Sequence, residues 1–499
     1  GSKYLTATIP GGLTVTNSVT ITFGAATQLA IVQQAAGAVN GLAFSTQPQV
    51  VFQDISGNTV DTTDSIDVSS SGSVLGGTHP VAAVAGKATF TNLKLTGTIG
   101  TYQLTFTSGN LTSPPQDIIV TFGAATKLVL TTSPLGFVNR TNFTTQPVIA
   151  VQDASGNTVT NASMSIDVSS DTADLTGTLR VNVVNGIATF VGLGNAGTVG
   201  AKHLTFKKVG GGLTEAVFDY ILTHGTATKI VVSRSAAGAK SGQTFTTQPK
   251  IQVQDADSNL VTTGIASTAK IRLSVSSDAY DANAHTGVNL TGPTSFDNVD
   301  AVAGEATFAD ARLEGVVAAA YVLKFTIVNT AGFDGLATAQ NIALTAGTET
   351  HLAVVQQPTA IVAGATFSPV VAVQILDAWN NRVLDVANTV TVKPTLVDDA
   401  LASNVLDSSK SAVANSSGLV TFTGLTFTKA GTQFIQFTST GLVAATSTGF
   451  AIANAQAHHL VWVTSPVGAK NDYAIKGAGN ANPELEIRDQ YENPVVTGA

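Results

Sequence analysis

The chain of 499 residues contains no cysteine and a single methionine, and charged and aromatic residues make up only 11% and 6% of it. Without cysteine no disulfide can form, so each folded unit must depend on burying its own apolar core, which a domain of about 100 residues can do. Lys and Arg number 24 against 32 Asp and Glu, a net charge of −8. Nucleic-acid binding needs clustered Lys and Arg, so we expect no nucleic-acid partner.

Long apolar runs are missing as well. No stretch of the sequence approaches 18 apolar residues, so we expect no membrane insertion in this segment. Serine and threonine are abundant instead, with 107 residues together, and 47 residues are glycine. Threonine and valine suit the pleated surface of a sheet, whereas glycine, asparagine and aspartate suit turns. The composition therefore favours short strands separated by turns.

One motif recurs along the chain. Residues Phe143–Asn157 read Phe-Thr-Thr-Gln-Pro-Val-Ile-Ala-Val-Gln-Asp-Ala-Ser-Gly-Asn, a short apolar strand that begins at a proline and ends at an Asp-to-Asn turn. Further copies, some of them looser, lie at Phe44–Asn58, Phe245–Asn259, Phe367–Asn381 and Pro483–Asn493. Aspartate side chains commonly cap the backbone N–H groups of such turns. We therefore predict structural turns from Asp54 to Asn58, from Asp153 to Asn157 and from Asp255 to Asn259.

The spacing of the copies predicts the domain organisation, because fixed self-similarity is the signature of tandem repeats. A first-strand Leu or Ile recurs at Leu29, Leu128, Ile230, Leu352 and Leu460, each after a joint of three or four residues. We predict four complete repeats and two partial ones, and we expect the partial repeats to continue in a longer polypeptide. The predicted boundaries are 1–24 (last strands only), 25–123, 124–225, 226–347 (with a loop insertion), 348–455 and 456–499 (first strands only).

Short strands at regular spacing predict an all-β sandwich. In the repeat at 124–225, we place His203 in the position that Tyr102 occupies in the preceding repeat. The predicted strands of this repeat are 127–132, 147–153, 165–169, 179–184, 187–190, 203–206 and 216–222.

The back half of each repeat carries a second signature, Gly-x-Ala/Val-Thr-Phe, as in Gly186–Phe190, followed by a strand such as Gly100–Phe106. Together with the Asp-x-x-Gly-Asn turn, this pairing resembles the group 1 bacterial immunoglobulin-like domains of invasin- and intimin-type surface proteins. The resemblance covers essentially the whole chain. It implies tandem immunoglobulin-like β-sandwiches joined by very short linkers in an extracellular setting, and it carries over no binding site. The Thr-Gln-Pro before the second strand departs from that pattern, so the adhesin subfamily is not assigned.

Candidate sites for chemistry are sparse. The seven histidines are scattered, so no nucleophile, base and orienting group come together, and we expect neither an enzyme nor a cofactor. Calcium, which needs six to eight oxygen ligands, is an alternative for the densest carboxylates, although turns are favoured over calcium. These carboxylates are Asp255, Asp257, Asp278 and Asp281. Glycosylation sequons occur about as often as chance predicts, at Asn110, Asn139, Asn142, Asn161, Asn289 and Asn415.

These features favour a structural segment of a long extracellular or cell-surface protein. We hypothesise a semi-rigid rod that associates with neighbouring subunits into a surface layer, sheath or filament. The alternative is the stalk or ligand-binding region of an adhesin that recognises a glycan or protein on a host or cell surface through loops. The longest insertion, within 278–304, is the first candidate for such a loop.

Overall fold

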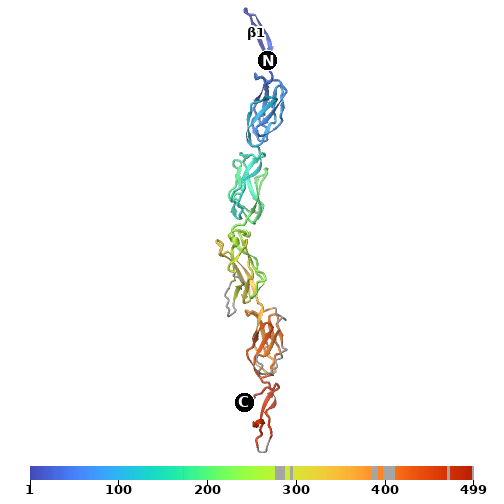
Figure 1. The fold of residues 1–499 in the computed structure, drawn as a ribbon, viewed down its shortest axis with the longest axis vertical. Coiled ribbons are helices and arrows are strands. Elements are labelled where there is room, and N and C mark those ends of the chain that lie inside the picture. Colours follow the sequence, from blue (N-terminus) through green and yellow to red (C-terminus); the bar gives the residue numbers. More distant parts are fainter. Residues whose placement is uncertain are drawn as a thin grey trace. The chain divides into compact units, whose positions relative to one another are not determined.

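Strands make up almost all of the regular structure (Figure 1). The computed structural model describes residues 1–171, 174–275, 287–292, 296–384, 391–396, 411–468 and 473–496. Within these ranges there is no α-helix, and single 3₁₀ turns lie at Ile265–Thr268 and Ala478–Asn480. The chain forms two units, one of Gly1–Thr226 with Asp257–Asn259 and the other of Ala227–Ala256 with Leu260–Ala499.

The first complete repeat of the first unit has two principal sheets, in the orders β3-β5-β9 and β4-β13-β11-β6-β8. The short strand β4 runs parallel to the last strand, β13. The first, second and fifth main strands (β3, β5 and β9) form one sheet, and the third, sixth and seventh (β6, β11 and β13) form the other. This is the immunoglobulin strand order. The strands are β3 (Gln28–Gln33), β4 (Ala38–Val39), β5 (Gln49–Gln53), β6 (Ser65–Ser70), β7 (Val74–Gly76), β8 (Val81–Ala82), β9 (Lys87–Thr89), β10 (Lys94–Thr96), β11 (Gly100–Ser108), β12 (Leu111–Thr112) and β13 (Gln116–Thr121).

The second repeat has the same order, with sheets β14-β16-β20 and β19-β17-β22-β23 and a small sheet β15-β21-β18. Every strand predicted for this repeat overlaps an observed one, whereas β15, β18 and β21 were not predicted because two or three residues show no alternation. The strands are β14 (Ala125–Thr132), β15 (Thr141–Asn142), β16 (Val148–Asp153), β17 (Ser165–Ser170), β18 (Asp174–Thr176), β19 (Arg180–Asn182), β20 (Ile187–Thr189), β21 (Gly194–Ala196), β22 (Gly200–Lys208) and β23 (Ala216–Leu222).

One expectation for this repeat was wrong. Tyr102 lies opposite Ile118 in the β11–β13 pair, and the equivalent residue opposite Tyr220 in the β22–β23 pair is Lys202. His203 therefore points the other way and is exposed, because neighbouring residues on a strand alternate between its two faces.

The second unit contains the third repeat, with sheets β24-β26-β30, β25-β33-β32-β27-β29 and β28-β31, and the fourth, with sheets β38-β37-β41-β42-β34-β36-β39 and β35-β43-β40. The strands of the third repeat are β24 (Lys229–Arg234), β25 (Ala239–Lys240), β26 (Lys250–Gln254), β27 (Lys270–Val275), β28 (Val288–Thr291), β29 (Val299–Asp300), β30 (Glu305–Thr307), β31 (Arg312–Gly315), β32 (Ala318–Val328) and β33 (Ala337–Thr345). Those of the fourth are β34 (Glu349–Gln356), β35 (Ile361–Val362), β36 (Val371–Asp377), β37 (Thr391–Leu396), β38 (Ala412–Val413), β39 (Leu419–Phe422), β40 (Gly431–Gln433), β41 (Ile435–Ser439), β42 (Leu442–Thr446) and β43 (Phe450–Ala453).

Each end of the chain contributes one strand pair. At the start, β1 (Ser2–Thr8) pairs antiparallel with β2 (Thr14–Thr20), and at the other end β44 (Ala457–Thr464) pairs with β45 (Glu484–Asp489). By sequence the first pair matches the last two strands of a repeat, and the second pair matches the first two.

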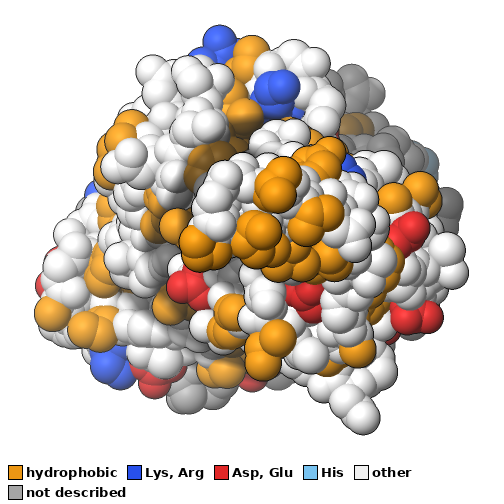
Figure 2. Space-filling view, turned by 90° about the horizontal axis from the view of Figure 1, so that it is seen from above, with side chains coloured by type: hydrophobic (Ala, Val, Ile, Leu, Met, Phe, Trp, Pro, Cys, Tyr) orange, Lys and Arg blue, Asp and Glu red, His pale blue; other side chains and the backbone are white. Residues whose placement is uncertain are grey.

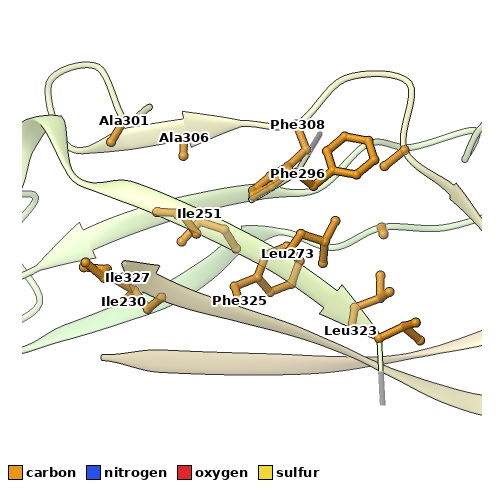
Figure 3. Close-up of a cluster of buried hydrophobic side chains, with 14 of the residues drawn as sticks. Ile230, Ile251, Leu273, Phe296, Ala301, Ala306, Phe308, Leu323, Phe325 and Ile327 are labelled. Carbon is orange, nitrogen blue, oxygen red and sulfur yellow. The ribbon is translucent and has the colours of Figure 1, made fainter. Parts of the chain in front are cut away.

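Every complete repeat has its own buried core. In β6, Ile66 and Val68 are buried while Asp67 between them is exposed, the alternation expected of a strand with one face on a core. A phenylalanine pair recurs across each sandwich, with ring centroids 5.4 Å apart for Phe90 and Phe106. Figure 3 shows the equivalent pair of the third repeat, Phe308 and Phe325, also 5.4 Å apart, among Ile, Leu and Ala side chains. The predicted fold, tandem immunoglobulin-like β-sandwiches with very short linkers, is confirmed.

The surface is poor in charge. Figure 2 shows single Lys, Arg, Asp and Glu side chains scattered among uncharged and apolar ones. Across the described ranges, no helix is long and apolar enough to cross a membrane.

Candidate functional site at the repeat junctions

The aspartate that ends the second strand of a repeat organises the turn after it. Asp153 is 1% exposed, and its Oδ1 accepts hydrogen bonds from the backbone N–H groups of Ser155 and Asn157 at 3.0 and 2.9 Å. Asp54 makes the same two bonds with Ser56 and Asn58, at 3.0 and 2.9 Å. This geometry is that of an Asx turn, in which a carboxylate replaces a backbone acceptor. Asp377 and Asp489 repeat it in the second unit.

The second carboxylate oxygen reaches the linker before the repeat. Oδ2 of Asp153 accepts the N–H of Gly123 at 2.9 Å, and Oδ2 of Asp377 accepts the N–H of Gly347 at 2.8 Å. A Cβ atom added at Gly123 would lie 2.7 Å from the carbonyl oxygen of Asn40, which is too close for any other residue without a backbone shift. One aspartate thus fixes both its own turn and the adjoining linker. The same bond joins Gly24 to Asp54 and Ala455 to Asp489.

The asparagine that closes the turn also contacts the preceding repeat. Asn157 Nδ2 donates to the carbonyl oxygen of Gly97 at 2.8 Å, and the N–H of Ile99 donates to Asn157 Oδ1 at 2.9 Å. We call this pair of bonds the asparagine clamp. It recurs in the first unit with Asn259 on Gly197 and Val199, and in the second unit with Asn381 on Gly315 and Val317 and with Asn493 on Thr428 and Ala430.

The clamp asparagines are buried, between 0% and 8% exposed. In contrast, Asn58 is exposed, and each of its described hydrogen bonds lies within its own turn. The two hydrogen bonds of a buried clamp fix the position of the backbone loop in the preceding repeat. If the loop moved away, the buried amide of the asparagine and the backbone groups of the loop would lose their hydrogen-bond partners.

A second asparagine supports the clamp in the first unit. Asn40 donates from Nδ2 to Asp153 Oδ2 at 2.8 Å and accepts the N–H of Gly97 at 3.0 Å. One repeat later, Asn139 donates to Asp257 Oδ2 at 2.8 Å and accepts the N–H of Gly197 at 3.0 Å. The junction is therefore a continuous hydrogen-bonded network of side chain and backbone.

Hydrogen bonds keep these carboxylates ionised. The pKa of Asp54 is lowered to about 2, chiefly by the side-chain hydrogen bond from Asn58 and by the N–H of Gly24. Burial of Asp153 acts to raise its pKa, but the bonds from Asn157, Gly123 and Asn40 outweigh burial and lower it to about 2. Asp257 also has a lowered pKa, mainly because Arg140 donates to both of its oxygens, at 2.7 and 2.6 Å.

The calcium candidates fall in different surroundings. Asp255 is 1% exposed, the Asp257 carboxylate is engaged by Arg140 and Asn139, and Asp278 and Asp281 lie outside the described residues. Across the part of the chain that the structure describes, no three His, Asp or Glu side chains gather in a way that could hold a metal ion.

The sequons also differ in their surroundings. Asn139 is 2% exposed and hydrogen-bonded to Asp257, so its amide is closed to a glycosylating enzyme in the folded chain. The remaining five are exposed, namely Asn110, Asn142, Asn161, Asn289 and Asn415. Of the candidate loop 278–304, residues 278–286 and 293–295 lie outside the described residues.

The contact between each turn and the preceding repeat was not predicted from the sequence. One signal was available: the last asparagine is present in every copy of the motif, even where the glycine before it is replaced, as at Asn380-Asn381 and Glu492-Asn493. A residue that persists where the turn itself varies indicates a second role.

No protein-family model and no curated protein sequence matches this chain. Among solved structures, the chain is similar to invasin, a bacterial integrin-binding protein, with 12% identity, 88% of this chain and 82% of invasin covered, and a TM-score of 0.32. It is also similar to the Escherichia coli adhesin FdeC (15% identity, 65% and 100% covered, TM-score 0.30). A third similar structure is that of the extracellular cadherin domains 1–5 of protocadherin gamma B2 (10%, 92% and 87% covered, TM-score 0.29). At these values the functions of those proteins do not transfer to this chain, and the fold assignment rests on the strand order described above.

Proposed function

We propose that this chain is a structural segment of an extracellular or cell-surface protein, in which clamped junctions hold successive sandwiches as a semi-rigid rod. The observation that carries the proposal is the asparagine clamp, which repeats with the same two bonds at 2.7 to 2.9 Å at each of its four occurrences. Domains joined within one chain ordinarily move relative to one another unless their interface is large and apolar. An asparagine clamp that recurs along the chain is a different way to restrict that motion.

The linkers support the same proposal. Gly123 and Gly347 are each held by a buried carboxylate, so the joints have no freely rotating Gly/Ser stretch. The network needs neither disulfide nor metal, which fits a chain without cysteine. Such a chain keeps its spacing under both oxidising and reducing conditions.

Self-association with neighbouring subunits is the finer part of the proposal. Large apolar side chains are exposed on strands of three repeats: Ile119 on β13, Ile221 on β23 and Val443 on β42 are between 67% and 69% exposed. Lateral contact between copies in a layer, sheath or filament would cover such residues. In the alternative, an adhesin stalk, they stay in water and a loop binds the ligand.

Electron microscopy of the purified chain distinguishes these outcomes. The proposal predicts extended particles of uniform length, which associate into regular layers or fibres at high concentration. Extended particles that stay monomeric and bind a glycan array would favour the adhesin stalk. Particles that bend freely at every joint would contradict the rod itself.

A further inference from the structure

The joint between the third and fourth repeats carries charged residues at positions that are uncharged in the other repeats. Lys240 lies opposite Thr345 in the parallel β25–β33 pair. The equivalent parallel pairings of the other repeats hold a valine, namely Val39, Val138 and Val362. Arg382 directly follows the clamp asparagine Asn381. The residues that follow the other clamp asparagines are uncharged, namely Thr158, Leu260 and Pro494.

A third charged residue lies where the linker enters the fourth repeat. Glu349 comes two residues after Gly347, the linker residue that the turn aspartate holds. The other linkers have alanine at this position, namely Ala26, Ala125, Ala227 and Ala457. Because only 11% of the chain is charged, three charged residues at one joint are a local concentration that the shared fold does not require.

The three residues line one hollow of about 510 Å³ within the second unit. Lys240 and Gln243 come from the third repeat, Thr348 and Glu349 from the linker and the start of β34, and Arg382 from the fourth repeat. Sites for small molecules are usually hollows of about 300–1,000 Å³. The hollow therefore has the size of a ligand site.

Hydrogen bonds hold the walls of this hollow in place. Gln243 Nε2 donates to Thr348 Oγ1 at 2.6 Å, which joins the third repeat to the linker. The N–H of Val317, another lining residue, donates to Oδ1 of the clamp asparagine Asn381 at 2.9 Å, and Arg382 comes next in the chain. A site whose walls are fixed before binding loses less conformational freedom when a ligand arrives.

The charged side chains of the hollow do not neutralise one another. In the part of the chain that the structure describes, Lys240, Glu349 and Arg382 form no ion pair and no side-chain hydrogen bond. The other arginines each bond to an acidic side chain or to a backbone carbonyl oxygen, namely Arg140, Arg180, Arg234, Arg272, Arg312 and Arg488. Arg382 thus keeps its fork of N–H donors for a ligand.

The mixture of groups indicates the class of ligand. A guanidinium such as that of Arg382 binds a carboxylate through two parallel hydrogen bonds, and Lys240 adds a second positive charge. Glu349 accepts hydrogen bonds from hydroxyl groups and repels a small dianion such as sulfate. We propose that the hollow binds the acidic sugar of a glycan, a uronic acid, whose carboxylate lies on Arg382 and Lys240. The sugar hydroxyl groups then bond to Glu349, Gln243 and Thr348.

This binding goes beyond the structural role, because it needs only the joint of the third and fourth repeats and not a stiff rod. Its failure would leave the rod untouched, and microscopy tests the rod separately. NMR titration of the full, isotopically labelled chain with glucuronate tests the binding. We expect saturable shifts of the amide signals of Thr348 and Arg382. Glucose, which has the same ring without the carboxylate, should cause no such shifts.

Two variants locate the binding. Arg382→Gln and Lys240→Val should each fold, as judged by circular dichroism, because the first side chain is exposed and valine stands at the second position in the other repeats. Each should weaken glucuronate binding about tenfold or more, the effect of losing one charge-assisted hydrogen bond. Arg272→Gln is the matched control. It removes the same charge from the third repeat, where Arg272 pairs with Asp297 and does not line the hollow, and it should bind glucuronate like the parent chain.

Several outcomes would overturn the proposal. Glucuronate might leave the signals of the hollow unshifted, or glucose might shift them equally, and either result would exclude a site built for a carboxylate. Equal shifts with inorganic sulfate would show that the hollow attracts any anion and does not recognise a sugar. Binding that persists unchanged in Arg382→Gln or Lys240→Val would exclude the assigned residues.

Discussion

Asn157 donates a hydrogen bond from its side-chain amide to the carbonyl oxygen of Gly97, 60 residues earlier in the chain, at 2.8 Å. The same side chain closes the turn that Asp153 begins, with Nδ2 3.0 Å from Asp153 Oδ2. One amide group therefore ties the conformation of a turn to the position of the preceding repeat. This double role explains why the asparagine recurs even where the glycine of the turn does not.

The clamp asparagine should matter more than its unclamped equivalent. Asn157→Ala removes both bonds to Gly97 and Ile99 and leaves buried backbone groups without partners, which costs about 1–3 kcal/mol for each group. We expect the Ile99 amide to exchange its hydrogen at least tenfold faster in this variant, as measured by hydrogen exchange with NMR detection.

Asn58→Ala is the matched control, because Asn58 bonds within its turn but is exposed and does not clamp a preceding loop in the described residues. This variant should leave exchange at Ile99 unchanged. Equal effects of the two substitutions would show that the turn alone, and not the clamp, accounts for the change.

Acid should loosen the junction within a defined range of pH. The pKa of Asp153 is about 2 in the folded chain against an ordinary value of 3.8, so the folded state favours its ionised form, and ionisation stabilises the fold. This contribution is fully present above about pH 4, and it is lost as pH falls through the folded pKa near 2. Asp153→Asn should flatten the dependence of the melting temperature on pH between 4 and 2. A parent chain whose stability is constant over this range would contradict the assignment.

The ion pair of Arg140 and Asp257 should contribute little to stability. The Arg140 side chain is 58% exposed, and solvent-exposed pairs typically contribute less than about 1 kcal/mol. Arg140→Ala should shift the melting temperature only slightly. It should nevertheless raise the pKa of Asp257, because the guanidinium is the main cause of the lowered value. An NMR titration of the Asp257 carboxyl checks the second effect, and an unchanged pKa would contradict the assigned cause.

Each sandwich should unfold on its own when its core is damaged. Phe106 is 0% exposed and packs against Phe90, so Phe106→Ala should destabilise the first repeat by about 3–5 kcal/mol. Calorimetry should show one transition moved to lower temperature while the others stay in place. A uniform shift of all transitions would indicate one cooperative unit instead of independent cores.

Much of the fold could be predicted from the sequence because the repeats supply the same evidence several times. The alternation in Ser65–Ser70 and the Gly-x-Ala-Thr-Phe signature identify strands and the faces they bury. The clamp could not be predicted, because the loop at Gly97–Ile99 has no motif of its own and is brought to Asn157 only by the tertiary fold.

The register of strand β22 shows a second limit of prediction from the sequence. Alignment of the motifs placed His203 at the position equivalent to Tyr102. Counting two residues from the aligned glycines Gly100 and Gly200 shows instead that Lys202 is the equivalent of Tyr102. A shift of one residue exchanges the two faces of a strand. The register therefore places Lys202, and not His203, opposite Tyr220.

The most direct test of the clamped junction is a distance distribution between two repeats. The chain has no cysteine, so spin labels can be placed at Val74→Cys and Val217→Cys, whose parent side chains are 71% and 58% exposed in the first and second repeats. Electron paramagnetic resonance should give one narrow distance distribution for the parent chain and a broad one after Asn157→Ala. A broad distribution in the parent, or one that Asn157→Ala leaves unchanged, would contradict the account.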